Sequence, residues 1–174
     1  MAGDAHAGIE EPEVIDGDES RGPRASPEHQ RAIVALTDAY ARDPMGNGAP
    51  LAPDVAARLI PGLRGHPTTL VLLAVVAGVP VGIATCFLGF STFQARPLLN
   101  VHDLAVLPEH RGMGLGRRLL EAVESKARVL GCCKVTLEVL EDNRAARRPY
   151  ARAGFGQAVY TDAAGGALFY SKSL

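Results

Sequence analysis

The chain has 174 residues, of which 47% are hydrophobic and 21% are charged. These are the proportions of a globular protein, so they exclude wholesale disorder, and the length suits one compact domain rather than two. The formal net charge of -1 gives no indication of a nucleic-acid-binding protein.

The charge is unevenly distributed along the chain. Residues 1–20 hold seven acidic side chains and neither Lys nor Arg. They contain almost no large apolar residue, so they cannot bury enough surface to offset the entropy of ordering. We predict a disordered acidic tail over residues 1–20, followed by a single domain over residues 21–174 with a mild excess of Lys and Arg.

Two helices are predicted at the start of this domain. Residues 26–28 read Ser-Pro-Glu, which is typical of a helix N-cap, a first-turn proline and a first-turn acid. The helix is expected to end before Pro44, because the residue before a proline disfavours helical dihedrals. A second, shorter helix is expected from Pro53 through Leu59, closed by the Pro61-Gly62 pair.

The pattern then changes to strands. Thr69–Ala77 is short, rich in Val and Leu and bounded by turn residues, which is typical of a buried strand. Val81–Gly89 is predicted to return antiparallel to it as a hairpin, and Leu99–Val106 to form a third strand. The longest apolar stretch, residues 70–79, is far shorter than the roughly 20 residues of a membrane helix, so no membrane association is expected.

The second half of the domain alternates helices and strands. Leu115–Leu130 has a continuous apolar face and is predicted as an amphipathic helix that ends at Gly131. The other elements expected are a strand over Lys134–Leu140, a helix over Asn143–Ala153 capped by Asn143, and weaker strands near Gln157–Tyr160 and Ala167–Ser171. Strand, helix and strand in succession imply a parallel strand pair with a right-handed crossover.

The three cysteines are Cys86, Cys132 and Cys133. Their number is odd and no CxxC occurs, so neither a disulfide framework nor a zinc site fits. We predict buried thiols in a reducing cytosol. No basic start followed by an apolar run is present at the N-terminus, so no secretory signal is expected and the predicted location is cytoplasmic.

The segment Val106–Gly116, with the sequence VLPEHRGMGLG, is the most informative part of the chain. A strand ends there, a glycine-rich turn follows, and a helix begins at once. The glycines let backbone N–H groups point into one concavity, and the helix N-terminus adds unpaired donors and a partial positive charge. With Arg111 and Arg117 beside it, this turn is predicted to hold a pyrophosphate group.

Two familiar phosphate motifs do not fit this turn. The dinucleotide fingerprint needs GxGxxG, whereas the glycines here stand as GxGxG. The P-loop needs Lys and then Ser or Thr after its last glycine, where Arg117 and Arg118 stand. On the glycines alone, a tight turn that binds nothing and an unrelated α/β phosphate-binding module stay open as alternatives.

A second motif lies further along the chain, in residues 141–155, which read EDNRAARRPYARAGF. Together the two motifs resemble those of the GCN5-related N-acetyltransferase (GNAT) superfamily, closely over residues 99–155 and in the order of elements over residues 26–174. The first motif of that family is Arg or Gln, any two residues, Gly, one residue, and Gly or Ala. The positions that match the two motifs are Arg111, Gly114 and Gly116, and then Asn143, Ala146, Tyr150, Gly154 and Phe155.

The resemblance implies an α/β fold with a central mixed, mostly antiparallel sheet, a splayed parallel strand pair and flanking helices. It implies that acetyl-CoA lies in the split and that its acetyl group passes, without a metal, to a primary amine in a direct ternary complex. The acceptor is then a small-molecule amine or a protein amine. The residues expected to bind the coenzyme are Leu104, Ala105, Val106, Arg111, Gly112, Met113, Gly114, Leu115, Gly116, Arg117 and Asn143.

For the reacting centre, the resemblance assigns Tyr150 as the acid that protonates the leaving thiolate, while a backbone N–H within Leu104–Val106 polarises the thioester carbonyl. Asp103 is the preferred base, or else it attracts a cationic amine while water carries the proton. His102 has a better intrinsic pKa, but strand alternation places it on the face opposite Asp103. Glu138, on the next strand, is a third candidate.

Pro149 departs from the family pattern. A proline inside the helix removes a backbone hydrogen bond and is expected to kink the chain or open its last turn, which would displace Tyr150. The alternative function is therefore an acyl-CoA sensor with weak or no turnover. The predicted wall of the acceptor site is the loop Asp43–Pro50 together with Phe90–Phe93, and a homodimer is an expectation from the family only.

Overall fold

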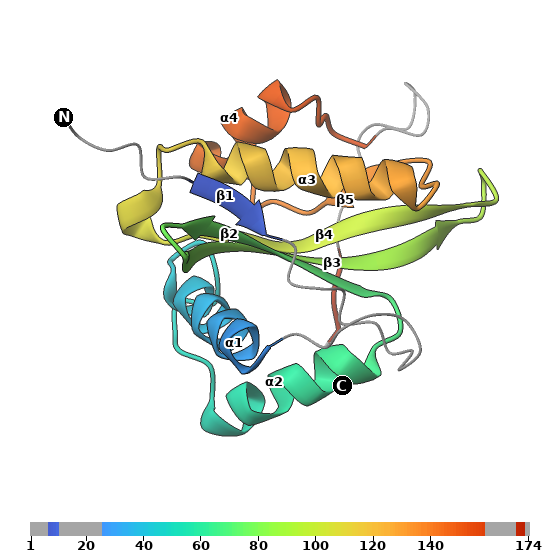
Figure 1. Ribbon diagram of the computed structural model, residues 1–174. Coiled ribbons are helices and arrows are strands. Elements are labelled where there is room, and N and C mark those ends of the chain that lie inside the picture. Colours follow the sequence, from blue (N-terminus) through green and yellow to red (C-terminus); the bar gives the residue numbers. More distant parts are fainter. Residues whose placement is uncertain (1–6, 11–25, 159–169, 173–174) are drawn as a thin grey trace. The chain divides into compact units, whose positions relative to one another are not determined.

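A computed structural model describes residues 7–10, 26–158 and 170–172 of the chain (Figure 1). By its internal contacts the chain divides into two units, Met1–Leu137 and Glu138–Leu174. In the residues that the structure describes, no helix is long and apolar enough to cross a bilayer.

The described part of the first unit contains a five-stranded sheet with the strands in sequence order. The strands are β1 (Ala7–Glu10), β2 (Thr69–Val76), β3 (Val79–Ser91), β4 (Arg96–Val106) and β5 (Val135–Leu137). Neighbouring strands pair antiparallel except β4 and β5, which are parallel. The predicted fold class, a mixed and mostly antiparallel sheet with one parallel pair, is confirmed.

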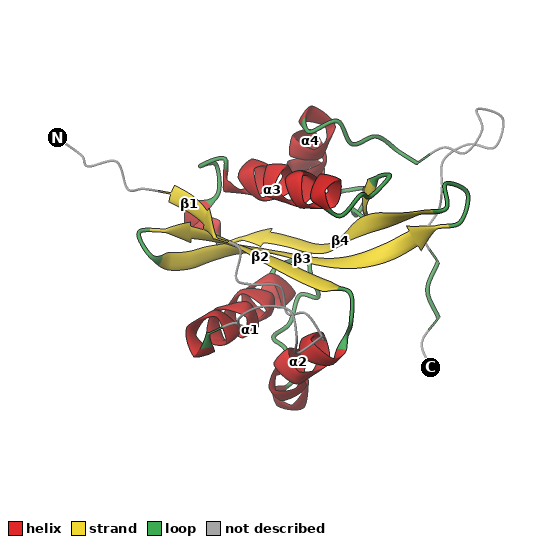
Figure 2. Cartoon of the chain, turned by 45° about the vertical axis from the view of Figure 1, so that its right-hand side comes forward, coloured by secondary structure: helices red, strands yellow, loops and turns green. Residues whose placement is uncertain are grey.

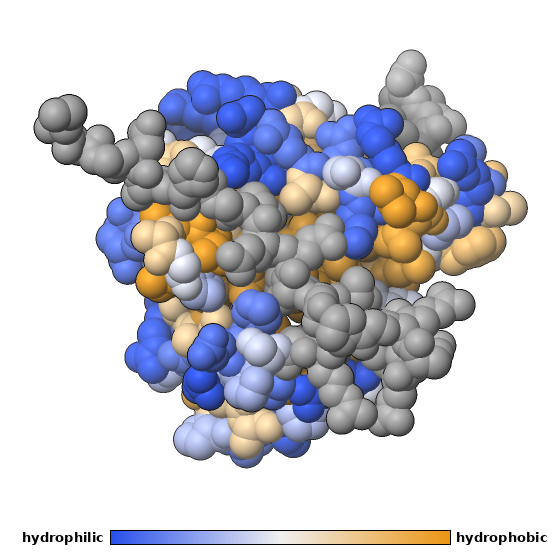
Figure 3. Space-filling view, in the orientation of Figure 1, coloured by the Kyte–Doolittle hydropathy of each residue, from blue (hydrophilic) through white to orange (hydrophobic). Residues whose placement is uncertain are grey.

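Helices cover both faces of this sheet (Figure 2). The helices α1 (Pro27–Arg42) and α2 (Pro53–Gly65) lie on one face, and α3 (Leu115–Val129) lies on the other. Each face has its own buried cluster, in which alternate strand residues meet helix side chains. The cluster under α1 and α2 is Ile33, Leu36, Leu63, Val71, Leu73, Val75 and Ile83. In Figure 3 the hydrophobic colour is concentrated at the level of the sheet, between hydrophilic helix surfaces.

The strand β1 lies inside the segment predicted to be a tail. Its residues pair antiparallel with β2, from Ala7 opposite Val76 to Glu10 opposite Leu73. Edge pairing of the backbone needs no large side chain, which is why composition did not reveal it. The rest of the predicted tail lies outside the described residues.

The first helix begins and ends as predicted, whereas the second is longer than predicted. The Ser26 hydroxyl accepts a hydrogen bond from the His29 N–H at 3.2 Å, as an N-cap does. The helix α2 continues through Pro61 to Gly65. Its last turn buries Leu63 against Ile33 and Leu36, and this burial offsets the hydrogen bond that the proline cannot make.

The second unit contains one described helix, α4 (Arg144–Arg152). It runs through Pro149 without an interruption, and the Ala153 N–H donates to the Pro149 carbonyl at 3.0 Å. The expected opening of the last turn is therefore wrong, whereas the kink stays a prediction. The predicted strands near Gln157–Tyr160 and Ala167–Ser171 fall largely outside the described residues, and no strand is present at residues 157–158 or 170–171.

The loop after α1 depends on glycine at one position. A Cβ atom on Gly46 would lie 2.2 Å from the Tyr40 carbonyl oxygen, which is backbone and cannot move aside cheaply. We expect Gly46→Ala to lower the free energy of unfolding by about 1–3 kcal/mol.

The matched control is Gly62→Ala in α2, where a Cβ meets nothing within 4 Å. There alanine should stabilise the helix by about 0.5–1 kcal/mol. Urea denaturation of both variants checks the two signs, and equal effects would contradict the prediction.

Candidate active site

The parallel pairing of β4 is short. Along its length β4 pairs with β3, but β5 pairs with it only over Leu99–Val101. Beyond Val101, no described strand lies on that side of β4. The N–H and C=O groups along that edge of Leu104–Val106 therefore have no strand partner among the described residues, as in a splayed pair.

A β-bulge interrupts β4 beside this edge. Asp103 lies opposite Thr85, whereas Val101 lies opposite Cys86, so His102 is an inserted residue without a cross-strand partner. A bulge breaks the regular alternation of side chains. Regular alternation therefore does not determine which face of the sheet the side chains of residues 101–103 occupy.

Both His102 and Asp103 lie on the face covered by α1 and α2. The His102 ring contacts the ring of Phe87, which packs against the cluster on that face, with centroids 5.5 Å apart. Asp103 shares a face with its partner Thr85. Thr85 lies on the same face of β3 as Ile83 and Phe87, because side chains two positions apart on a strand point the same way. The prediction that these two residues point to opposite faces is wrong, because His102 is itself the extra residue of the bulge and regular alternation does not pass through it.

The electrostatics of this face distinguish Asp103 from an ordinary surface carboxylate. Burial raises the pKa of Asp103, and the neighbouring His102 opposes that rise. Tyr40, in the last turn of α1, has its pKa raised by burial and then by the charges of Asp103 and Asp43. Sequence reasoning missed Tyr40 as a site residue, because its helical spacing marked it only as a core position.

The glycine-rich turn provides a run of unpaired backbone donors. A short 3-10 helix, Pro108–His110, precedes it, and Gly112 and Gly114 have φ of 81° and 79° before α3 begins. The Arg111 N–H donates to the Pro108 carbonyl at 3.2 Å. Within the described parts of the chain, no backbone hydrogen bond uses the N–H groups from Gly112 through Arg117. The donor run predicted for residues 111–117 therefore begins at Gly112.

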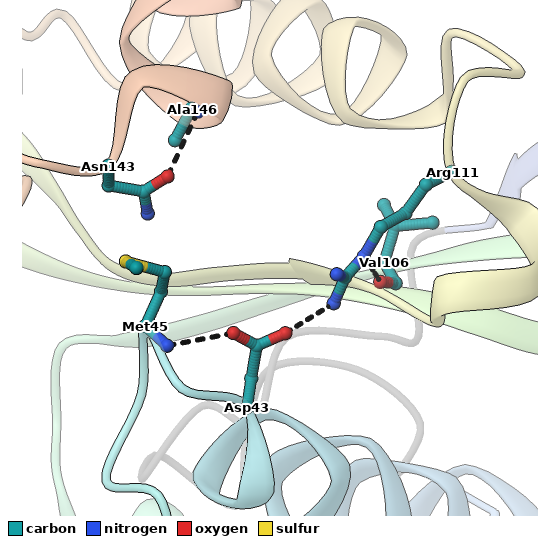
Figure 4. Close-up of polar contacts among 6 residues, drawn as sticks. All are labelled: Asp43, Met45, Val106, Arg111, Asn143 and Ala146. Atoms are coloured by element: carbon teal, nitrogen blue, oxygen red, sulfur yellow. Dashed lines mark hydrogen bonds and ion pairs between the residues drawn. The ribbon is translucent and has the colours of Figure 1, made fainter.

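The Arg111 side chain is held by groups of the chain itself (Figure 4). Its Nε donates to the Val106 carbonyl at 2.9 Å, and its terminal nitrogen pairs with the Asp43 carboxylate at 2.6 Å. The other Asp43 oxygen accepts the Met45 N–H at 2.8 Å. The Met45 N–H and the Arg111 guanidinium together hold the pKa of Asp43 below its usual range. No sequence signal indicated this pair, because 68 positions separate its members.

A small pocket lies between α1 and the end of β4. Its lining combines apolar side chains with the Tyr40 ring and the Arg111 side chain. The full lining is Leu36, Ala39, Tyr40, Ala105, Val106, Leu107, Pro108 and Arg111. The pocket thus joins the face that carries Asp103 to the residues that precede the donor run.

The second unit carries the other predicted residues. Asn143 caps α4, because its Oδ1 accepts the Ala146 N–H at 3.1 Å (Figure 4). Its predicted role as a cap is confirmed, and its side-chain NH₂ remains as the group for the predicted pantetheine contact. The Tyr150 ring contacts the Phe155 ring with centroids 6.1 Å apart. Glu138 follows β5 and is exposed.

One predicted wall of the acceptor site is wrong. Phe90 lies opposite Pro97, near the tip of the β3–β4 hairpin. Pro97 precedes Asp103 by six positions along β4, which is roughly 20 Å of extended strand. Phe90 and Phe93 are exposed at that tip. The other predicted wall, the loop after α1, begins with Asp43 and is joined to the donor run through Arg111.

The three thiols differ in burial. Burial raises the pKa of the Cys86 thiol to about 12, so it is a neutral core group as predicted. The prediction is wrong for Cys132 and Cys133, which are only half-buried. Among the described residues, no group of three His, Cys, Asp or Glu side chains could hold a metal ion.

Comparison with known proteins gives the family. The model of the acetyltransferase (GNAT) family matches residues 33–155, which is more than half of the chain. The chain belongs to the GNAT family. This match confirms the resemblance seen in the two motifs of this GNAT chain, since both motifs lie within residues 33–155.

Two curated relatives and a solved structure agree with this assignment. An uncharacterised N-acetyltransferase of Archaeoglobus fulgidus is 37% identical over 47% of this GNAT chain and 56% of its own length. A thialysine N-epsilon-acetyltransferase of Bos taurus is 32% identical over 42% of the chain and 43% of its own length. The chain thus matches about half the length of these relatives. The aminoglycoside N-acetyltransferase AAC(6′)-Iy in complex with CoA has the same fold, with a TM-score of 0.70 at 15% identity over 100% of this chain and 99% of that one.

Proposed function

We propose that this GNAT chain is an N-acetyltransferase that moves an acetyl group from acetyl-CoA to a primary amine in a direct ternary complex. The observation that carries the proposal is the run of N–H groups from Gly112 through Arg117, which have no backbone acceptor among the described residues and lie at the start of α3, after β4. Consecutive amides at a helix N-terminus are a natural site for a diphosphate.

The space beside these donors supports the same conclusion. A Cβ placed on Gly112, Gly114 or Gly116 would meet no atom within 4 Å, so the turn is open on the side of its glycines. The edge of Leu104–Val106, which has no strand partner among the described residues and whose Val106 carbonyl accepts from Arg111, offers its other main-chain groups to the pantetheine arm. Asn143, in the second unit, is proposed to add its side-chain NH₂ as a further donor. When bound, acetyl-CoA supplies the activated acetyl thioester.

The side chains of the chain would then divide the proton transfers between them. In this proposal, Asp103 either removes the proton of the acceptor amine or attracts the cationic amine while water carries the proton. Its raised pKa suits the first role better than the pKa of a free aspartate does. Tyr150 returns a proton to the leaving sulfur. A backbone N–H within Leu104–Val106 polarises the thioester carbonyl.

The acceptor is proposed to be a cationic primary amine, either a small molecule or a protein amine. The charge of Asp43 is compensated by Arg111, which leaves Asp103 as the carboxylate beside Tyr40 that can attract a cation. The names of the relatives support an amine acceptor, since one acts on thialysine and a structural neighbour is an aminoglycoside acetyltransferase.

Gly116→Asp tests the coenzyme site directly. A carboxylate there would stand among the proposed diphosphate donors, so we expect the affinity for CoA to fall at least about tenfold. The free protein should keep its thermal stability or gain slightly, because an acid in the first turn complements the helix dipole. Isothermal titration calorimetry with CoA, together with a melting curve of the free protein, measures both effects.

The matched control is Gly116→Asn, which has the same shape without the charge. It should lose clearly less CoA affinity than Gly116→Asp. If the wild type and both variants bound CoA equally well, the diphosphate would not sit on this turn and the proposal would be rejected.

A further inference from the structure

The loop after α1 is folded tightly against the end of that helix. The N–H groups of Asn47 and Ala49 both donate to the Ala41 carbonyl, at 3.0 and 3.2 Å. At the far end of the loop, the Leu51 N–H donates to Asp38 in α1 at 2.8 Å. Residues 43–51, called the acceptor loop below, therefore form one structured segment with bonds at both ends.

The Asp43 carboxylate serves two segments at once. One of its oxygens accepts from Met45 inside the acceptor loop, and the other pairs with Arg111. The Asp43 side chain is 16% exposed and that of Arg111 is 52% exposed, so the carboxylate is the more sheltered member of the pair. An ion pair of this kind, with one member largely buried and further hydrogen-bonded, is held more firmly than an exposed one.

The Arg111 guanidinium also binds the end of β4, through the Val106 carbonyl. Arg111 directly precedes Gly112, the first residue of the donor run. One side chain therefore connects the last residue of β4, the coenzyme turn and, through Asp43, the acceptor loop.

We propose that the Asp43–Arg111 pair is a positioning link through which occupancy of the coenzyme turn stabilises the acceptor loop. The inference rests on the proposed function, since it needs a coenzyme on residues 112–117. A ligand that fixes the backbone next to Arg111 also fixes its guanidinium, and this suppresses the local openings that separate it from Asp43. The acceptor loop therefore opens less often once the coenzyme has bound. Asp43 and Arg111 are positioning residues in this account.

Hydrogen exchange of the full chain, with and without saturating CoA, tests the link. In the wild type we expect CoA to slow exchange about fivefold or more at two places, the amides of 112–117 and those of the acceptor loop, including Met45. In Arg111→Gln, slowing at 112–117 should persist, because Gln also opens this motif in the family, whereas slowing in the acceptor loop should be lost. Asp43→Asn removes the charge of the other member of the pair and should give the same result.

The matched control is Arg58→Gln, which removes a similarly short arginine–aspartate pair, 2.8 Å long and largely exposed on α2. It should leave both responses to CoA unchanged. If CoA slowed only residues 112–117 in the wild type, or if the acceptor loop still responded in both variants, the link would be refuted while the proposed function stood. If CoA slowed neither region, the proposed function would fail and the link with it.

Discussion

Replacing Tyr150 by Phe should lower the turnover number by about 10²–10⁴-fold while leaving the affinity for CoA nearly unchanged. The substitution removes one oxygen and keeps the ring that contacts Phe155. In the proposed reaction that oxygen supplies the proton to the leaving thiolate, so its loss affects the chemical step alone. Turnover is followed by release of the CoA thiol over a panel of cationic and neutral amines, and CoA affinity by calorimetry.

The matched control for this prediction is Tyr170→Phe. Tyr170 is 82% exposed and has no part in the proposed reaction, so its variant should turn over like the wild type. A wild type that binds CoA but releases no thiol with any amine would favour the sensor alternative. A small loss in Tyr150→Phe would mean that α4 does not bring this hydroxyl to the reacting sulfur.

The second large effect is expected for Asp103→Asn, which should reduce turnover by at least about 10²-fold near neutral pH. Burial raises the pKa of Asp103, so the carboxylate that accepts the proton or attracts the cationic amine is lost as the pH falls through that raised value. The plot of wild-type rate against pH should therefore fall on its acidic side, and this acidic limb should lie at a pH above the ordinary titration range of aspartate. That limb should be missing from the residual rate of Asp103→Asn.

The same substitution should stabilise the fold. A carboxyl whose pKa is raised in the folded state binds its proton more tightly there than in the unfolded chain, so stability decreases as the pH rises through this range. Asn carries no charge to bury, and we expect Asp103→Asn to unfold at a higher urea concentration than the wild type at pH 7. Opposite effects on rate and stability are typical of a site residue.

Two further variants complete this experiment. Asp54→Asn removes an exposed aspartate of α2 and should change neither the rate nor the acidic limb. His102→Gln tests the neighbouring candidate on the same face of the sheet. If the limb vanished in His102→Gln and persisted in Asp103→Asn, the base would be His102 and the proposed role of Asp103 would be wrong.

Features that depend on a few consecutive residues could be predicted from the sequence. The caps at Ser26 and Asn143 are local, and so is the glycine turn, whose dihedrals at Gly112 and Gly114 follow from the residue type. The GNAT assignment followed from two such local motifs. The acetyl acceptor does not follow from either motif, because acceptor groups are contacted by side chains from separate elements.

Features that depend on packing between distant segments could not be predicted. The bulge at His102 is set by the register of β4 against β3, which no single strand encodes. The continuation of α2 past Pro61 depends on the burial of Leu63 under the sheet. The Asp43–Arg111 pair joins residues that only the folded chain brings together.

The buried cysteine on β3 has a practical consequence for measuring the proposed reaction. A thiol with a pKa of about 12 and no access to solvent does not react with a chromogenic disulfide reagent at neutral pH. Of the chain's own sulfhydryls, only Cys132 and Cys133 can then add to the colour produced by released coenzyme, and Cys132 reacts slowly because burial raises its pKa. A protein blank in which a third sulfhydryl becomes titratable would show that the sample has begun to denature.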